Sequence, residues 1–313
     1  MKTSSFTVSV PAKIHLLGEH AAVYGKPALL TAVDRRLSVT VGSSDHSKDS
    51  EEHLPLRQII EPIIIKELNI KKIPPYTLTI SSQIPIGCGL GSSAAISASF
   101  IAALLLFLKI KWDVELVNKL AFEAEKVFHG NPSGGDNAAV CFGGLIWFQK
   151  ISQDEKIIKQ LQFSIPENLS RNFVLIDSGK PVESTGEMVG SVQSLKLEKP
   201  EIVDRFLDDQ EKLTQELVEV IKNGDEGKFI RIIREGEKNL ERIGVVSEFV
   251  NKIIREIEDT GGAAKISGGG GKTKGTGILL AYHSDVSIIK AIANRNKLSC
   301  FQTKLGVEGL RKE

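Results

Sequence analysis

The chain has 313 residues, and its 40 basic and 39 acidic side chains leave a formal net charge of +1. This balance produces no overall field that would attract nucleic acid or an acidic membrane surface, so neither is expected as a partner. The length is sufficient for two domains or for one large α/β unit with a substantial core. Bulk properties therefore predict a soluble enzyme or binding protein.

Cysteine usage and the N-terminal residues bear on the compartment. The chain has three cysteines, Cys88, Cys141 and Cys300. Their number is odd and no two of them are spaced as C-x-x-C, so neither a disulfide framework nor a zinc site is expected. Residues 1–10 lack the apolar core and cleavage site of a signal peptide. The longest apolar run, residues 94–108, falls short of the ~20 residues that span a bilayer. A cytoplasmic location is predicted.

The first half of the chain is predicted to mix strands with helices. Alternating or apolar patterns predict strands at 6–10, 12–17, 28–32, 37–41, 76–80 and 145–148, and helical spacing predicts helices at 56–68 and 92–108. Asp113 is a candidate N-cap for a further helix that ends near His129, because Asn131-Pro132 cannot easily continue it. The polar run from Ser43 to His53 predicts a surface loop.

The second half is richer in charged amphipathic helices. These are predicted at 184–195, 199–223, 226–243, 247–258 and 286–293, with strands at 173–176, 263–267, 276–282 and 298–302. No repeat of 20–50 residues is visible. Strands mixed with helices throughout predict an α/β or α+β fold, with a domain boundary between Gln149 and Asp177.

A glycine-rich junction, PIGCGLGSSAA at residues 85–95, is the most informative motif. Glycine permits positive φ and close approach of the backbone to a ligand. The helix that follows offers unpaired N–H groups and the positive end of its dipole, which together favour an anion. Ser92 and Ser93 could cap the helix, bind phosphate or coordinate Mg²⁺. By itself the motif is equally compatible with a tight turn and a serine N-cap.

Lys13 stands in an otherwise apolar strand, within PAKIHLLGEH at residues 11–20. A buried lysine needs a partner, so Lys13 either lies beside a carboxylate or phosphate or faces solvent on an edge strand. Without other motifs, the edge-strand interpretation is favoured. Glu19 and His20 follow the break at Gly18, where polar side chains can reach a ligand or simply be solvated.

Two acidic residues are candidates for the site: one lies in the predicted helix that begins after Asp113, and the other follows that helix. Glu125 is at the edge of an apolar helical stripe and could hold a metal, while Asp136 follows a Pro-Ser-Gly-Gly turn. Glu125 and His129 share a helix face, but no third ligand supports zinc. Oxygen ligands from serine and glutamate suit Mg²⁺ better, and His129 is interpreted as a helix-terminating residue.

A second glycine run, KISGGGG at residues 265–271, lies between two predicted strands. It predicts either close backbone packing against a loop or nucleotide phosphate, or a flexible hairpin. Lys272 and Lys274 are interpreted as a solvated tip. Asp177-Ser178-Gly179 and Ser184-Thr185 are each most simply explained as turn or N-cap residues.

Together and in this order, the motifs at 11–20, 85–95 and 265–271 resemble those of the galactokinase, homoserine kinase, mevalonate kinase and phosphomevalonate kinase (GHMP) superfamily. Within it, GEHAAVYGKPAL at 18–29 and HGNPSGGDNAAVCFGG at 129–144 are similar to the mevalonate kinases. The resemblance implies an α+β fold with an N-terminal domain of the ribosomal-protein-S5 type at 1–165 and a ferredoxin-like C-terminal domain at 166–313.

The resemblance also implies roles for individual residues. Asp136 would be the general base, or the residue that orients the attacking hydroxyl, and Lys13 would pair with it. Glu125 with Ser92 or Ser93 would hold Mg²⁺, and Glu19, His20 and Thr185 would contact mevalonate. ATP would lie between the domains, against Pro85, Gly87, Gly89, Leu90, Gly91, Ser92, Ser93, Ala94, Gly269 and Gly270.

The implied reaction is MgATP-dependent phosphorylation of the C5 hydroxyl of mevalonate. A related kinase acting on phosphomevalonate or on the 3-hydroxyl of mevalonate is an alternative. A third possibility is a catalytically inactive sensor, which is disfavoured because Lys13, Glu125 and Asp136 are all present. The charged C-terminal helices could face solvent or a partner subunit, which leaves a homodimer open.

Overall fold

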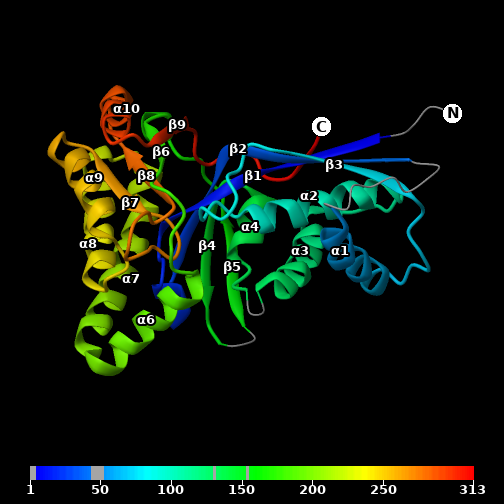
Figure 1. Ribbon diagram of the computed structural model, residues 1–313, viewed down its shortest axis with the longest axis horizontal. Coiled ribbons are helices and arrows are strands. Elements are labelled where there is room, and N and C mark those ends of the chain that lie inside the picture. The colour runs from blue at the N-terminus through cyan, green and yellow to red at the C-terminus, as the bar shows by residue number, and fades with distance from the viewer. Residues whose placement is uncertain (1–4, 44–52, 130–131, 153–154) are drawn as a thin grey trace.

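A computed structural model describes residues 5–43, 53–129, 132–152 and 155–313 (Figure 1). The strands are β1 (Ser5–Leu17), β2 (Ala28–Ser43), β3 (Tyr76–Ser82), β4 (Leu145–Lys150), β5 (Lys156–Leu161), β6 (Phe173–Asp177), β7 (Ala263–Ile266), β8 (Ile278–Tyr282), β9 (Ser299–Thr303) and β10 (Arg311–Lys312). The helices are η1 (Ala21–Tyr24, 3₁₀), α1 (Leu54–Glu67), α2 (Ser92–Phe107), α3 (Val114–His129), α4 (Gly135–Phe142), α5 (Glu167–Ser170), α6 (Thr185–Glu198), α7 (Pro200–Asn223), α8 (Glu226–Arg242), α9 (Glu248–Asp259) and α10 (Val286–Arg295).

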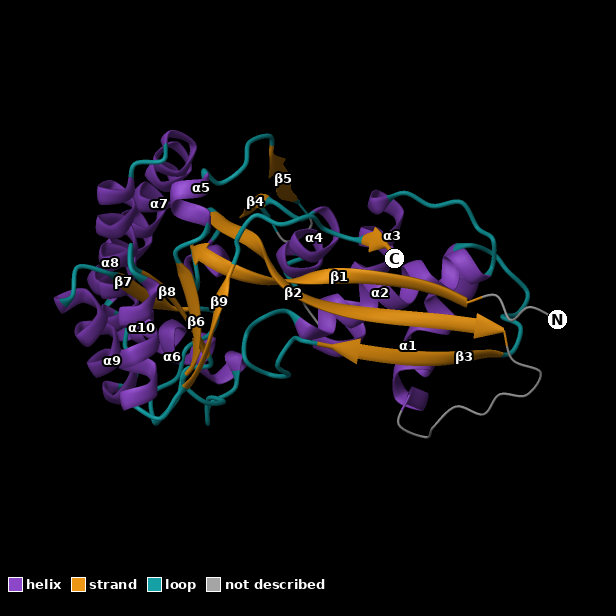
Figure 2. Ribbon diagram, turned by 90° about the horizontal axis from the view of Figure 1, so that it is seen from above, coloured by secondary structure: helices purple, strands orange, loops and turns teal. Residues whose placement is uncertain are grey.

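The first sheet is antiparallel and has the order β10-β1-β2-β4-β5, with β3 also paired to β2. Figure 2 shows β1, β2 and β3 as long neighbouring strands, with α1 and α2 lying behind them. The sequence predicts separate strands at 28–32 and 37–41, but β2 runs through both. The polar residues between them remain in the strand because Arg36 donates hydrogen bonds to Ser9 and to Gly309.

The three long helices of this region, α1, α2 and α3, follow the predicted pattern, and the short ones do not. Asp113 caps α3, since its carboxylate accepts a hydrogen bond from the N–H of Leu116 at 2.8 Å. Helix α4 is not predicted, because its short GDNAAVCF sequence contains weak helix formers. Packing decides the conformation instead, since most of the residues of α4 are buried. The structure also contains η1, α5, β5 and β10, which the sequence pattern does not predict.

The second sheet has the order β7-β8-β6-β9 and is also antiparallel. In Figure 1 the helices α7 to α10 flank it at one end of the molecule. Strand β6 serves two cores: Phe173 and Leu175 belong to the apolar cluster shared with the first sheet, and Val174 and Ile176 to the cluster under α9 and α10. This alternation follows from the two-residue period of a strand.

The last residues of the chain return to the first sheet. Strand β10 pairs with β1, and isolated bridges join Leu305 to Val33 and Glu308 to Gly143. The division into domains at residues 165 and 166 stays a prediction. Within the part of the chain that the structure describes, no helix is both long and apolar enough to span a membrane. Most of the predicted loop at 43–53 lies outside the described residues.

Candidate active site

The glycine-rich loop before α2 lies between the two sheets. Its Gly87, Gly89 and Gly91 all have positive φ, at 76°, 85° and 74°. On one side the carbonyl of Leu90 accepts a hydrogen bond from the N–H of Lys13, at 3.1 Å. On the other side the carbonyl of Cys88 accepts one from the N–H of Ile278, at 3.3 Å. Both sheets therefore fix the path of this loop.

Close packing explains why two of these positions are glycine. A Cβ at Gly91 would lie 2.7 Å from Cγ of Lys13, and one at Gly89 would lie 3.0 Å from the carbonyl oxygen of Ser267. Side chains there would displace either the lysine or the second glycine loop. The predicted nucleotide-binding residues from Pro85 to Ala94 thus form one segment at the N-terminus of α2, with its unpaired N–H groups.

Lys13 and Asp136 form an ion pair with an Nζ to Oδ2 distance of 3.1 Å. The lysine side chain is only 4% exposed, so the interpretation of Lys13 as a solvent-facing edge residue is wrong. The carboxylate side chain is 38% exposed, which leaves it accessible to a reactant. Asp136 lies in the first turn of α4, where the helix dipole stabilises a negative charge.

A histidine contacts the same lysine. His15 Nδ1 lies 3.4 Å from Lys13 Nζ. Burial, followed by the charge of Lys13, lowers the pKa of His15 to about 3. The imidazole is therefore neutral at physiological pH, and Nδ1 can accept a hydrogen bond from the ammonium group.

Ser93 and Glu125 lie together beside this pair. Ser93 Oγ donates a hydrogen bond to Glu125 Oε2 at 3.2 Å. Burial, with a further contribution from the charge of Asp136, raises the pKa of Glu125 to about 7. Among the described residues, no group of three His, Cys, Asp or Glu side chains is arranged so that it could hold a metal ion. The hydroxyl and carboxylate oxygens present nevertheless suit Mg²⁺, which in proteins often takes one or two side chains and completes its shell with phosphate and water.

The second glycine loop meets the segment after β1. His20 Nε2 lies 3.0 Å from the carbonyl oxygen of Gly269, and the N–H of His15 donates to Ser267 Oγ at 3.3 Å. A Cβ at Gly269 would lie 3.2–3.3 Å from atoms of Thr185. Two of the residues predicted to contact substrate, His20 and Thr185, therefore flank the same glycine.

Glu19 forms an ion pair with Lys265, and the two side chains are 1% and 0% exposed. Lys265 belongs to the KISGGGG motif, from which no role for it was predicted. A role for Lys265 could have been predicted from the same pattern that drew attention to Lys13, which is a lysine among apolar strand residues. Glu237 of α8 lies nearby, buried, with its Oε2 accepting a hydrogen bond from the N–H of Ile266 at 3.0 Å.

The two glycine loops share a pocket of about 160 Å³. The residues that line it are Gly87, Cys88, Gly89, Lys180, Pro181, Glu183, Ser184, Thr185, Ser267, Gly269, Gly270 and Thr276. Ser184 forms a capping box with Glu187 at the start of α6, as its N-cap interpretation predicts. Asp177 accepts a hydrogen bond from the N–H of Gly179, which confirms a turn.

The residues after the second glycine loop are exposed, in agreement with the predicted tip. The strands on either side, β7 and β8, pair as an antiparallel hairpin, as one of the two interpretations predicted, and hydrogen bonds attach the C-terminal end of the glycine loop to neighbouring segments. Gly271 N–H donates to the carbonyl of Val245 at 3.0 Å, and Lys272 N–H donates to Glu183 at 3.2 Å. Lys272 Nζ donates to Ser191 Oγ.

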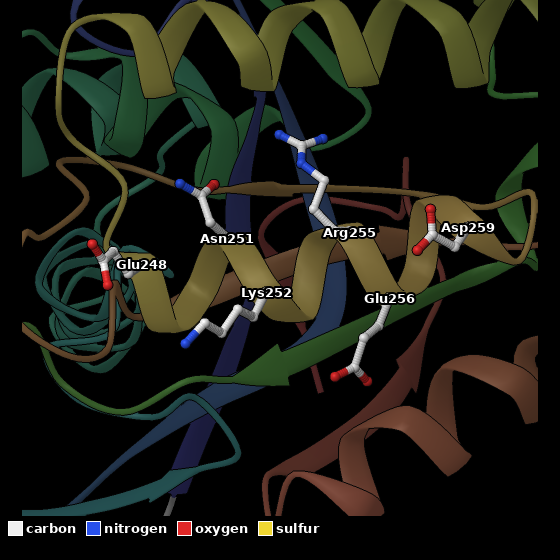
Figure 3. A pocket seen from close by; sticks show the side chains of 6 residues that line it. All are labelled: Glu248, Asn251, Lys252, Arg255, Glu256 and Asp259. Carbon is white, nitrogen blue, oxygen red and sulfur yellow. The ribbon is translucent and has the colours of Figure 1, made fainter.

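A second hollow lies on the surface of α9 and is shown in Figure 3. Asn251 and Arg255 point toward the neighbouring helix, and Lys252 and Glu256 point the other way. Arg255 forms ion pairs with Glu241 and Glu258, and Glu256 with Arg295. These ion pairs link α8, α9 and α10 to one another. The side chains that line the hollow are therefore accounted for by the packing of the helices.

Comparisons with known proteins agree with this arrangement. Residues 57–144 match the family described as GHMP kinases N terminal domain. A mevalonate kinase of Archaeoglobus fulgidus is 33% identical over 271 residues, which cover 84% of this chain and 88% of that protein. Among solved structures, the mevalonate kinase of Methanococcus jannaschii gives a TM-score of 0.81 at 21% identity, with 97% and 99% of the two chains covered. The L. major mevalonate kinase in complex with R-mevalonate gives 0.79 at 20% identity, with 98% of each chain covered.

Proposed function

The chain belongs to the mevalonate kinase family of the GHMP kinases, and we propose that it transfers the γ-phosphoryl group of ATP to the C5 hydroxyl of mevalonate. The family membership and the α+β fold confirm two expectations drawn from the sequence. The individual residue roles, Mg²⁺ and the acceptor hydroxyl are part of the proposal.

One observation carries the proposal. The Lys13–Asp136 ion pair lies beside the Ser93–Glu125 hydrogen bond, and Ser93 is in the first turn of α2, directly after the glycine loop. A base, a cation, oxygen ligands for a metal and an anion-binding helix terminus thus meet in one place. Phosphoryl transfer needs this combination, because its catalysis is mostly positioning and charge stabilisation.

In the proposed mechanism, Asp136 accepts the proton of the attacking hydroxyl through its accessible carboxylate. Lys13 orients Asp136 and favours the developing alkoxide by its positive charge. The N–H groups at the start of α2 bind phosphate oxygens. Ser93 and Glu125 would hold Mg²⁺, which supplies positive charge to the phosphates when it is bound.

The acceptor is proposed to lie between the turn after β1 and Gly269. His20 and Thr185 flank that glycine and would contact mevalonate. The contact of Glu19 with mevalonate stays a prediction, since its buried carboxylate is paired with Lys265. Of the two candidate serine ligands, the hydrogen bond to Glu125 favours Ser93 over Ser92.

The substitution Asp136→Asn tests the base assignment. It removes the proton acceptor but keeps the size of the side chain, so mevalonate-dependent release of ADP should fall by roughly 10²–10⁴-fold while ATP still binds. Turnover would be measured in a coupled assay with Mg²⁺ present and after chelation, and ATP binding by calorimetry. The wild type is expected to lose activity on chelation.

Asp259→Asn provides the matched control, because Asp259 is an exposed residue at the end of α9. Its turnover should equal that of the wild type. Near-wild-type turnover of Asp136→Asn would remove the base assignment. No mevalonate-dependent ADP release by the wild type would remove the proposed acceptor.

A further inference from the structure

Lys180 lies across the first glycine of the phosphate loop. A Cβ at Gly87 would be 3.6 Å from Cε and 4.0 Å from Nζ of Lys180. Lys180 also lines the pocket that the two glycine loops share, and it is exposed to solvent. Neither the sequence motifs nor the family resemblance assigns it a role. It nevertheless places an ammonium group at the opposite end of the loop from Lys13, which packs against Gly91.

The backbone just before Lys180 is hydrogen-bonded to the residue that precedes β8, the strand that also holds the loop. Ser178 N–H donates to the carbonyl of Gly277 at 3.0 Å, and Gly277 N–H donates to the carbonyl of Gly179 at 2.9 Å. The next residue, Ile278, donates to Cys88 of the loop. Gly277 and Ile278, at the start of β8, thus hold both segments, so the backbone next to Lys180 is fixed relative to the glycine loop.

The charges near the pocket leave Lys180 available. Lys13 is already paired with Asp136. Glu183 accepts hydrogen bonds from Lys272 and Thr273, and Asp177 accepts one from Gly179. Among the described residues, no carboxylate forms an ion pair with Lys180. A lysine without an acidic partner beside backbone N–H groups is suited to an anion with several charges.

We propose that Lys180 binds the phosphates of the nucleotide at the Gly87 end of the loop. This inference rests on the proposed function, because it assumes that the glycine loop receives ATP. Lys180 supplies a positive charge that Lys13 cannot provide, since Lys13 is engaged with Asp136. A polyphosphate then lies between two lysines, one at each end of the loop.

The test compares binding of ATP and of inorganic tripolyphosphate, by calorimetry, to the wild type and to Lys180→Gln. Loss of one charge-assisted hydrogen bond should weaken both ligands by ~10–100-fold. Lys180→Arg should retain affinity within ~3-fold, because it keeps the charge. Lys272→Gln is the matched control, since it removes an equal charge from an exposed lysine whose Nζ is bonded to Ser191.

Three results would overturn the inference. The first is an affinity of Lys180→Gln for ATP equal to that of the wild type. The second is a loss of affinity for ATP but not for tripolyphosphate, which would place Lys180 against the nucleoside. The third is a higher KM for mevalonate with unchanged ATP binding, which would assign Lys180 to the acceptor carboxylate. Binding needs no turnover, so a wild type that binds ATP but does not phosphorylate mevalonate would refute only the proposed function.

Discussion

At the scale of single residues, the site depends on lysines that the fold buries with a partner. Lys13 pairs with Asp136, and Lys265 pairs with Glu19. Removing water from a charge is unfavourable unless an opposite charge or hydrogen bonds replace it. The two pairs differ in consequence: Asp136 is accessible and available for chemistry, while Glu19 is enclosed and supports the turn that carries His20.

Glu237 adds a third carboxyl group to this buried region. Burial raises its pKa to about 8, although Lys265 and the N–H of Ile266 favour the charged form. In the unfolded chain the same group would release its proton near pH ~4.3. Between these values the native protein binds more protons than the unfolded chain, so the free energy of unfolding should fall as the pH rises.

The substitution Glu237→Gln should remove this contribution, because glutamine does not ionise. We expect the stability of the variant relative to the wild type to increase from pH 5 to pH 8, at up to about 1.4 kcal/mol per pH unit. Urea unfolding at several pH values measures this difference in the free energy of unfolding. Glu219→Gln, on the exposed face of α7, is the control. A difference between Glu237→Gln and wild type that does not vary with pH would contradict the raised pKa.

At the scale of elements, the loop before α2 and the short helix α4 place the reactive groups. Helix α2 is apolar on every side and buried, so its position is fixed by the core and its N-terminus is a rigid anion site. Helix α4 begins after Gly134, whose φ is 87°. It places Asp136 in its first turn, directed at Lys13.

Gly91→Ala tests the fit between the loop and Lys13. The new Cβ would lie 2.7 Å from Lys13 Cγ at a φ of 74°, so it would both strain the backbone and push the lysine from Asp136. We expect kcat/KM to fall by ~10²-fold, the effect of a small displacement of a catalytic group. Steady-state kinetics with ATP and mevalonate measures this.

Gly190→Ala is the matched control for this substitution. Gly190 lies within α6, and a Cβ there would meet nothing within 4 Å. Alanine is the better helix former, so activity should be unchanged and stability should rise by up to about 1 kcal/mol. Equal kinetics for the two variants would show that space at Gly91 does not matter.

At the scale of the whole molecule, the site lies where the two sheets meet. β1 contributes Lys13, β7 contributes Lys265 and the second glycine loop, and the first glycine loop is bonded to both β1 and β8. The end of the chain returns from the second sheet to the first. There Arg36 donates hydrogen bonds to Ser9 Oγ at 2.7 Å and to the carbonyls of Glu308 and Gly309 at 3.0 and 2.7 Å.

Arg36→Met should loosen the attachment of the C-terminal segment to the first sheet. It leaves several oxygens without their donor, so we expect the free energy of unfolding to fall by about 1–3 kcal/mol. Hydrogen exchange at residues 305–312 should accelerate as well. Arg205→Met, which removes an exposed side chain, should change stability by less than about 0.5 kcal/mol. Slow exchange retained in the Arg36 variant would show that strand pairing alone holds the segment.

Sequence alone determined the parts of this protein that depend on local chemistry. Apolar periodicity predicted most helices and strands, Asp113 was predicted as a cap, and the three motifs identified the kinase superfamily. The continuous strand β2 and helix α4 were not predicted, because the hydrogen bonds of Arg36 and the buried packing of α4 override weak local preferences.

Only the tertiary structure decided which charges meet. The sequence by itself favoured a solvated Lys13, and it could not pair Lys265 with Glu19 or place Lys180 against Gly87. Those residues are separated by tens to hundreds of positions, and no periodic pattern records contacts between distant segments. The energy of a buried charge depends on the group that faces it, which is a property of the folded chain.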